Sequence, residues 1–166
     1  MKDASDQART HTVTWTDPAE LHDRRKAMSG LEAMQAIVTG DLARAPAGAL
    51  VGWEHREVAT GRAVLVLTPA PYHFNHYQGV HGGILACLIE ATFGAAVSTV
   101  LPAGSLAATV DLHATFVRAA RLDTGELRCE AEVVHLGKRV ITAQARVTDA
   151  QGRLYAHAVT THTRVS

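Results

Sequence analysis

The stretch HGGILACLIEATFGAA, residues 81–96, places two glycines at the start of an otherwise apolar run. If a helix begins here, Gly82 and Gly83 lie at its unpaired N–H groups and at the positive end of its dipole. Because glycine has no side chain, a ligand oxygen can come close to this backbone. A carbonyl bound there would be polarised, and an oxyanion forming on it would be stabilised. The alternative is that the glycines only permit close packing of the helix against a sheet.

Glu90 is the single charged residue of this run, and acidic side chains are rarely buried without a partner. It follows Gly82 by eight residues, which is about 12 Å along a helix axis. One helix therefore cannot bring the Gly82 N–H and its own Glu90 to the same reacting carbon. Two such helices packed antiparallel about a two-fold axis can do so. The spacing predicts an obligate dimer in which each chain gives the glycine to one site and the acid to the other.

Capping residues predict two short helices before this run. Asp17 and Pro18 offer an N-cap and a first-turn proline. Ser29 begins a second capping pattern, followed by an apolar stripe that ends at Gly40. Pro46 and Gly48 then predict a loop. We expect an N-terminal tail and short helix over residues 1–28, and a single domain over residues 29–166.

The remaining elements are predicted to be strands around one long helix. GWEHREVATGRAVLVLT contains two extended runs joined at Thr60-Gly61, and turn residues separate four later runs. The long helix begins near His81, and because it is apolar nearly all round it must be enclosed. The sequence therefore predicts an α+β fold, a curved antiparallel sheet wrapped around one long central helix. The four later strands are expected at roughly 106–118, 125–135, 138–148 and 154–164.

Composition restricts the classes of function. The 166 residues contain 16 Lys and Arg against 16 Asp and Glu, which argues against a broad surface for nucleic acid. Two cysteines form no disulfide framework and indicate a reducing, cytoplasmic compartment. The polar start has no apolar secretory segment. Residues 84–101 are apolar, but the central Glu90 and the many small residues argue against a membrane span.

HFNHYQGVHGGILACLIEA resembles the core motif of the PaaI-type (phenylacetate-pathway) acyl-CoA thioesterases of the hotdog superfamily. That motif is an asparagine, five residues, His-Gly-Gly and an acid seven residues further on. The resemblance extends from about Gly30 to the end of the chain. It implies the hotdog fold and hydrolysis of an acyl- or aryl-acyl-CoA to the free acid and CoA. It also implies a homotetramer built as a dimer of dimers, and no cofactor, since coenzyme A is part of the substrate.

The resemblance assigns roles to the matching residues. The Gly82 N–H would polarise the thioester carbonyl. Glu90 of the facing subunit would act as general base on water or as the nucleophile. Asn75 would help orient the water or the carbonyl, and Thr109 would help position the water. His81 would hold the loop and the helix start in place.

Other residues are candidates for contacts with the substrate. The coenzyme A tail is polyanionic, and Arg118 and the pair Lys138-Arg139 are candidate phosphate ligands. Gly83 adds a second N–H at the helix start. The chain departs from the family in having Glu90 where many relatives have Asp, and Gln78 where a glycine is common. These departures bear on the shape of the acyl pocket.

Rival sites and functions are less well supported. His73, His76 and His81 cluster in sequence, but no carboxylate or cysteine completes a metal-ligand set, so no metal is expected. Cys87 and His81 are expected on different sides of the helix, with Cys87 buried and inert. A non-catalytic acyl-binding protein remains an alternative. A hotdog hydratase or dehydratase is disfavoured, because its catalytic His and acid would lie together along the helix.

Overall fold

The computed structural model, which describes residues 9–165, orders the chain as three short helices, two strands, one long helix and four strands. The α-helices are α1 (Pro18–Arg25), α2 (Gly30–Thr39), α3 (Pro46–Val51) and α4 (Gly82–Ser98). The strands are β1 (Glu54–Ala59), β2 (Arg62–Leu67), β3 (Leu106–Phe116), β4 (Leu127–Leu136), β5 (Val140–Thr148) and β6 (Leu154–Val165). Short 3-10 turns η2 (Pro71–His73) and η3 (Leu122–Thr124) lie in the connecting loops.

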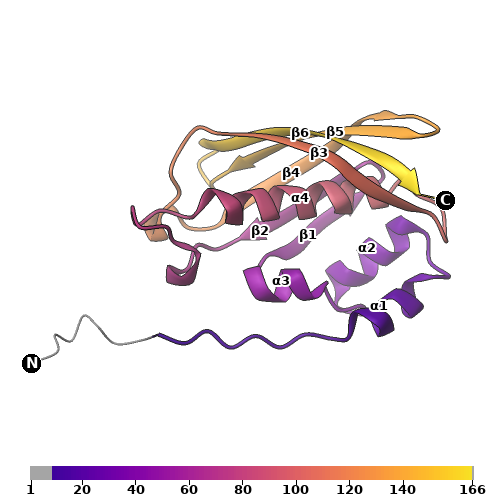
Figure 1. Cartoon of the computed structure of the whole chain (residues 1–166), viewed down its shortest axis with the longest axis horizontal. Helices are drawn as coiled ribbons and strands as arrows, with labels where there is room; N and C mark the ends of the chain where they lie inside the picture. Colours follow the sequence, from indigo (N-terminus) through magenta and orange to yellow (C-terminus); the bar gives the residue numbers. More distant parts are fainter. Residues whose placement is uncertain (1–8, 166) are drawn as a thin grey trace, which may run out of the picture.

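The six strands form one antiparallel sheet in the order β1-β2-β4-β5-β6-β3. Figure 1 shows the long strands as the upper layer, α4 running beneath them, and α1 to α3 below α4. β3 pairs only with β6 and is therefore an edge of the sheet, as β1 is at the other end. The predicted α+β fold, an antiparallel sheet curved around one long helix, is confirmed.

Period-two alternation places the core between the sheet and α4. In β5 the side chains of Ile141, Ala143, Ala145 and Val147 are buried, whereas Gln144 and its outward neighbours are not. The inward side chains meet the buried face of α4. This core holds α4 by one side only. The buried residues of that helix face are Leu85, Leu88, Ile89, Thr92, Phe93, Ala95, Ala96 and Val97.

The predicted helix starts are confirmed at both N-terminal helices. Asp17 Oδ1 accepts a hydrogen bond from the Ala19 N–H at 2.8 Å, and Pro18 is the first residue of α1. At α2, Ser29 and Glu32 form a reciprocal capping box. Gly40 ends α2 with a left-handed φ of 85°, a backbone conformation that suits glycine.

Two expectations were wrong. The predicted loop at Pro46 and Gly48 is the helix α3, because Pro46 sits at its first turn and Gly48 packs against Trp53. A Cβ at Gly48 would lie 2.9 Å from the Trp53 indole nitrogen. The sheet covers α4 from one side, and Gly83, Cys87 and Glu90 are exposed in the single chain. Cys87 is therefore not the buried residue that we expected.

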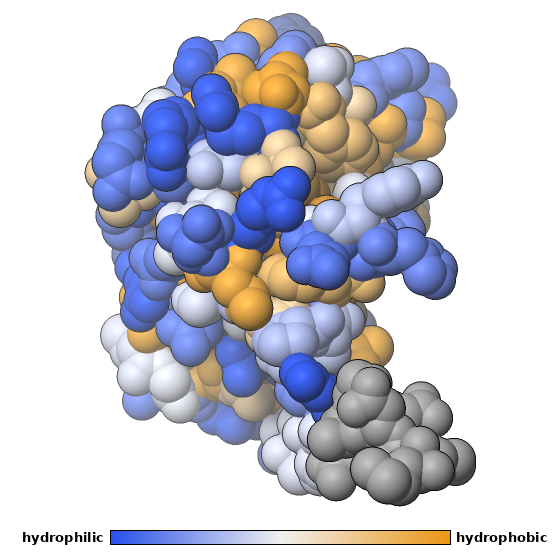
Figure 2. All heavy atoms as spheres, turned by 90° about the vertical axis from the view of Figure 1, so that its left-hand side faces the viewer, coloured by the Kyte–Doolittle hydropathy of each residue, from blue (hydrophilic) through white to orange (hydrophobic). Residues whose placement is uncertain are grey.

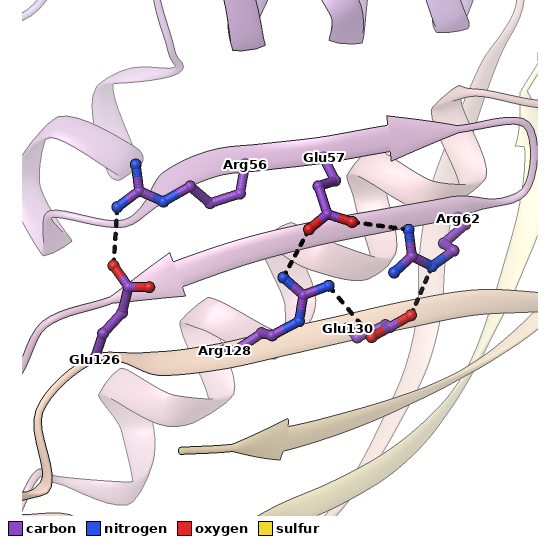
Figure 3. Close-up of polar contacts among 6 residues, drawn as sticks. All are labelled: Arg56, Glu57, Arg62, Glu126, Arg128 and Glu130. Carbon is purple, nitrogen blue, oxygen red and sulfur yellow. Dashed lines mark hydrogen bonds and ion pairs between the residues drawn. The ribbon is translucent and has the colours of Figure 1, made fainter. Parts of the chain in front are cut away.

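The outer face of β1, β2 and β4 carries a ladder of ion pairs (Figure 3). Glu57 accepts from Arg62 at 3.1 Å and from Arg128 at 2.9 Å, and Arg62 also reaches Glu130 at 2.6 Å. These side chains are partly exposed, so their contribution to stability is small. Each of these charges is paired with an opposite charge. This outer face is distinct from the side of the sheet that carries α4.

Gly30→Ala is expected to lower the free energy of unfolding by about 3 kcal/mol, because overpacked sites cost roughly that much. A Cβ at Gly30 would lie 1.7 Å from the Ser98 carbonyl oxygen, so the start of α2 would have to move away from the end of α4. Urea unfolding monitored by circular dichroism measures the change. Gly79→Ala is the control, because its Cβ would meet nothing closer than 3.4 Å. Equal midpoints for the two variants would show that the helices do not approach this closely.

Candidate active site

The start of α4 leaves one backbone N–H without a hydrogen-bond partner among the described residues. The Gly83 N–H donates to His81 Nδ1 at 2.9 Å. The N–H groups of Ile84 and Leu85 donate to the His81 carbonyl oxygen at 2.9 and 3.3 Å. Of the first four N–H groups of α4, the Gly82 N–H is thus the one that remains for a ligand at the positive end of the helix dipole.

Packing alone does not explain Gly82. A Cβ at this position would lie 3.6 Å from the nearest atom of the Phe116 ring, which is ordinary van der Waals contact. Gly83 is different, because its Cβ would lie only 3.0 Å from His81 Nδ1 and would crowd the helix cap. A side chain at Gly82 would fit within this chain, so the residue is suited to close approach by a ligand.

The loop before α4 is shaped by Asn75. Its Oδ1 accepts hydrogen bonds from the Tyr77 N–H at 2.9 Å and from the Gly79 N–H at 3.3 Å. Gln78 takes a left-handed φ of 60° between them, at the position where the sequence departs from the family's glycine. The loop then reaches His81, whose N–H donates to the His73 carbonyl oxygen at 2.8 Å. Asn75 thus holds the turn that leads into the helix start.

Glu90 and Thr109 lie together on the uncovered side of α4. The Thr109 hydroxyl donates to Glu90 Oε1 at 3.1 Å, which joins the helix to the edge strand β3. Glu90 belongs to the exposed part of α4 that also contains Gly83 and Cys87. Within one chain Glu90 lies eight residues, about 12 Å of helix, from Gly82. The chain brings Glu90 to Thr109 but not to Gly82.

His162 is a residue of this site that sequence reasoning missed. It lies directly across from Thr109 in the β3–β6 ladder, is 2 % exposed, and its Nε2 has no hydrogen-bond partner within residues 9–165. Burial lowers the pKa of His162, although the negative charges of Glu90 and Asp111 oppose that shift. The imidazole is therefore neutral at pH 7. The alternation of β6 could have placed it on the inward face, but only the pairing with β3 brings it to Glu90.

A cavity of about 690 Å³ opens beside this cluster. Glu90, Thr109 and His162 line one part of it. Its walls come from α1, α2, the uncovered side of α4 and the start of β3. Much of the lining is apolar, including Met34 and Trp53. A cavity of this size can hold a small ligand.

The three basic candidates lie at two ends of the sheet. Lys138 and Arg139 are exposed on the β4–β5 turn, and the Arg164 N–H donates to the Arg139 carbonyl oxygen, two residues from His162. Arg118 follows β3 at the other end, two residues after Phe116, whose ring lies beside Gly82. Its Nε donates to the Leu154 carbonyl oxygen at 3.3 Å, and its guanidinium lies 5.8 Å from the Tyr155 ring centre.

Exposed apolar side chains gather at the end of the molecule where α4 begins. Figure 2 views this end and shows orange apolar surface interrupted by blue polar groups. Phe116 is 46 % exposed beside Gly82, and Val117 and Leu122 follow it in the chain. Such a concentration is typical of a surface that contacts another molecule.

Two further features of the described residues bear on the class of site. Residues 9–165 contain no cluster of three or more His, Cys, Asp or Glu side chains arranged to hold a metal ion. The ring nitrogens of His73 are engaged with Ala70 and Val51. Over the same residues, no helix is both long and apolar enough to cross a bilayer.

Comparison with known proteins gives a consistent result. Residues 77–156 match the model of the thioesterase superfamily. A candidate esterase of Halobacterium salinarum is 42 % identical over 85 residues, and this match spans 46 % of the chain and 54 % of the relative, about half of each.

Two solved structures share the fold. The Escherichia coli PaaI protein from the phenylacetic acid degradation operon superposes with a TM-score of 0.73 at 21 % identity, over 83 % of this chain and 97 % of that one. A hypothetical thioesterase from Streptococcus pneumoniae, solved with coenzyme A, superposes with a TM-score of 0.63 at 23 % identity, over 69 % and 86 % of the two chains. Gly82, Glu90 and Thr109 lie inside the segment that matches the superfamily, whereas Asn75 and His162 lie outside it.

Proposed function

Since residues 77–156 match the thioesterase superfamily, in a chain that shares the hotdog fold of PaaI, we propose that this protein hydrolyses an acyl-CoA thioester to the free acid and CoA. The proposal rests on two groups that α4 provides at different positions along the helix. The helix offers an unpartnered Gly82 N–H at its start and a carboxylate, Glu90, hydrogen-bonded to Thr109 further along. These are an oxyanion donor and a base.

The complete site is formed by two chains. Glu90 and Gly82 of one chain are about 12 Å apart along the helix, so they serve different sites. The exposed part of α4 and the edge strand β3 supply the contact, and apolar Val110 on that strand is 62 % exposed. A two-fold axis beside this edge brings the helix start of one chain to the carboxylate of the other. We further propose that two such dimers form a tetramer.

The reaction needs few groups because a thiolate is a good leaving group. The substrate carbonyl accepts a hydrogen bond from the Gly82 N–H. Glu90 of the facing chain takes a proton from water as the water oxygen bonds to the carbonyl carbon, and Thr109 holds that water. The carbon–sulfur bond then breaks, the thiolate leaves and takes up the proton, and the acyl group departs as the acid. Direct attack by Glu90, through an anhydride that water then opens, is the other course that this geometry allows.

His162 supports this chemistry as a positioning residue. His162 lines the cavity that Glu90 and Thr109 also line, and its buried Nε2 has no hydrogen-bond partner among the described residues. A neutral imidazole there hydrogen-bonds the attacking water or the Glu90 carboxyl group. Asn75 supports the site less directly, because its Oδ1 accepts hydrogen bonds within the turn. Only its amide N–H groups remain for the substrate. His81 caps the start of α4, and the Gly83 N–H donates to the His81 side chain in this cap.

His162→Leu is expected to lower kcat about tenfold or more while leaving the folded state as stable as the wild type, or more stable. Removing a buried polar atom that has no partner does not cost a hydrogen bond in the fold. His162→Gln, which can still form hydrogen bonds, should keep more activity than His162→Leu. Thermal unfolding and steady-state thiol release measure the two effects. His157→Leu, on the outer face of the same strand, is the control. A lower melting temperature with unchanged kcat would make His162 a purely structural residue.

The polyanionic tail of coenzyme A requires basic contacts outside the reacting centre. Lys138 and Arg139 lie at the Glu90 end of the sheet and Arg118 at the Gly82 end, so a two-fold dimer places them around the same site. The S. pneumoniae structure was solved with coenzyme A, which favours this class of ligand for the present chain. The unpaired thiols Cys87 and Cys129 suit a reducing cytoplasm, where such substrates are found.

Thiol release from a panel of aryl- and alkyl-CoA thioesters, including phenylacetyl-CoA, tests the function directly. Turnover that disappears when the protein is diluted below its dimer dissociation constant, as measured by sedimentation, supports a shared site. An active monomer would overturn the two-chain arrangement. Calorimetric binding of non-hydrolysable acyl-CoA analogues without turnover on any thioester would instead favour an acyl-binding protein.

A further inference from the structure

The wall of the cavity that contains Glu90 also carries basic side chains. Arg25, from the end of α1, and His55, from β1, both line it. Within residues 9–165 Arg25 makes no ion pair, and burial lowers the pKa of its guanidinium. A half-buried cation without a counter-charge is costly for the folded chain, so an anion bound there would be stabilising.

His55 points to the same requirement. Its Nδ1 is buried and has no hydrogen-bond partner in the part of the chain that the structure describes. Burial and the positive charges of Arg44 and Arg25 lower the pKa of His55 to about 4. Arg44 is itself held in place, since its Nη1 donates to the Trp53 carbonyl oxygen at 2.9 Å. Two arginines thus act on His55, and no acidic side chain among the described residues is paired with Arg25.

Among the described residues that line the cavity, Glu90 is the one acidic side chain, and it belongs to the reacting centre. The wall that Glu90 shares with Arg25 and His55 also contains Met34, Trp53, Ala91 and Ala95, together with other small or apolar residues. An acyl chain whose carbonyl lies at Glu90 would therefore run along apolar wall and end beside Arg25 and His55.

We propose that this cavity binds an acyl group that carries a carboxylate at its far end, so that the substrate is the CoA thioester of a dicarboxylic acid. Arg25 and His55 form the subsite for the distal carboxylate, with Arg25 as the main charged ligand. This inference rests on the proposed thioesterase activity and names its substrate class. The same basic place could also take a phosphate of coenzyme A. The candidates for that role, Lys138 and Arg139, do not line the cavity.

The test compares adipyl-CoA with hexanoyl-CoA, which have acyl chains of equal length and differ in the distal carboxylate. We expect kcat/KM to favour adipyl-CoA by roughly tenfold or more, because hydrogen bonds to charged groups exceed neutral ones. Arg25→Gln should remove most of this preference by lowering kcat/KM for adipyl-CoA and not for hexanoyl-CoA. Arg24→Gln is the matched control, because Arg24 is exposed on the same helix and does not line the cavity.

The possible results distinguish a failure of the subsite proposal from a failure of the thioesterase proposal. Equal rates for both thioesters, unchanged by Arg25→Gln, would overturn the subsite and leave the thioesterase proposal standing. No turnover of either thioester would count against the activity itself. Equal losses on both thioesters in Arg25→Gln, absent with 3′-dephospho-CoA thioesters, would assign Arg25 to a phosphate and overturn the dicarboxylate class. His55→Gln provides a second variant, and it should weaken the adipyl preference in the same direction.

Discussion

Glu90→Gln is expected to lower kcat for thioester hydrolysis about a thousandfold, within the range that general bases contribute. The amide has nearly the same shape and can still accept the 3.1 Å hydrogen bond from Thr109, but it cannot take a proton from water or attack a carbonyl. KM should change little, because the carboxylate acts on the water. Thiol release with the best substrate of the panel measures the loss.

Folding and assembly are the necessary controls for this variant. Glu90 is exposed in the single chain and makes no ion pair among the described residues, so Glu90→Gln should keep the melting temperature and the oligomeric state of the wild type. Mixing inactive Glu90→Gln with inactive Gly82→Pro should restore activity, because a mixed dimer contains one intact site. A Glu90→Gln enzyme as active as the wild type would remove Glu90 from the mechanism.

Gly82→Pro is expected to lower kcat by about a hundredfold or more, which is the cost of removing one oxyanion donor. Proline deletes the Gly82 N–H, the one at this helix start that has no partner in the described chain. Proline is favoured at the first position of a helix, so the helix itself tolerates the change. His81, at φ −60° and ψ 135°, already has the backbone conformation that a residue before proline prefers.

Gly82→Ala distinguishes the effect of losing the N–H group from the effect of adding a side chain at this position. Alanine keeps the donor, and its Cβ would lie 3.6 Å from Phe116, so the variant should fold normally and lose less activity than Gly82→Pro. Circular dichroism and unfolding temperature verify that both variants keep α4. Equal activity of Gly82→Pro and the wild type would show that the oxyanion is stabilised elsewhere.

Local patterns were enough to predict most of the fold. The Ser29 capping box, the stop at Gly40 and the hairpin at Gly61 each depend on residues a few positions apart, and the structure has all three. The start of α4 at His81 was predicted from the same kind of signal. Pro46 and Gly48 were misread, because the contact that selects a helix there is made with Trp53 outside that segment.

The candidate site was less accessible, because its members meet only through the sheet. His162 reaches Thr109 by a pairing between β3 and β6, and nothing in the residues near His162 specifies that partner. Arg25 and His55 come from α1 and β1 and share only the cavity. Glu90 stood out in the sequence because it is charged within an apolar run, a signal that needs no knowledge of its neighbours.

Because β6 is the one strand that pairs with β3, the order of synthesis limits when β3 can join the sheet. β3 leaves the ribosome well before β6, and β4 and β5 are made between them. Until β6 is complete, β3 has no neighbour in its own sheet, and His162 has not yet reached Thr109. The edge at which two chains would meet is therefore the last part of the sheet to form. Subunits should therefore associate only after β6 has been made and has paired with β3.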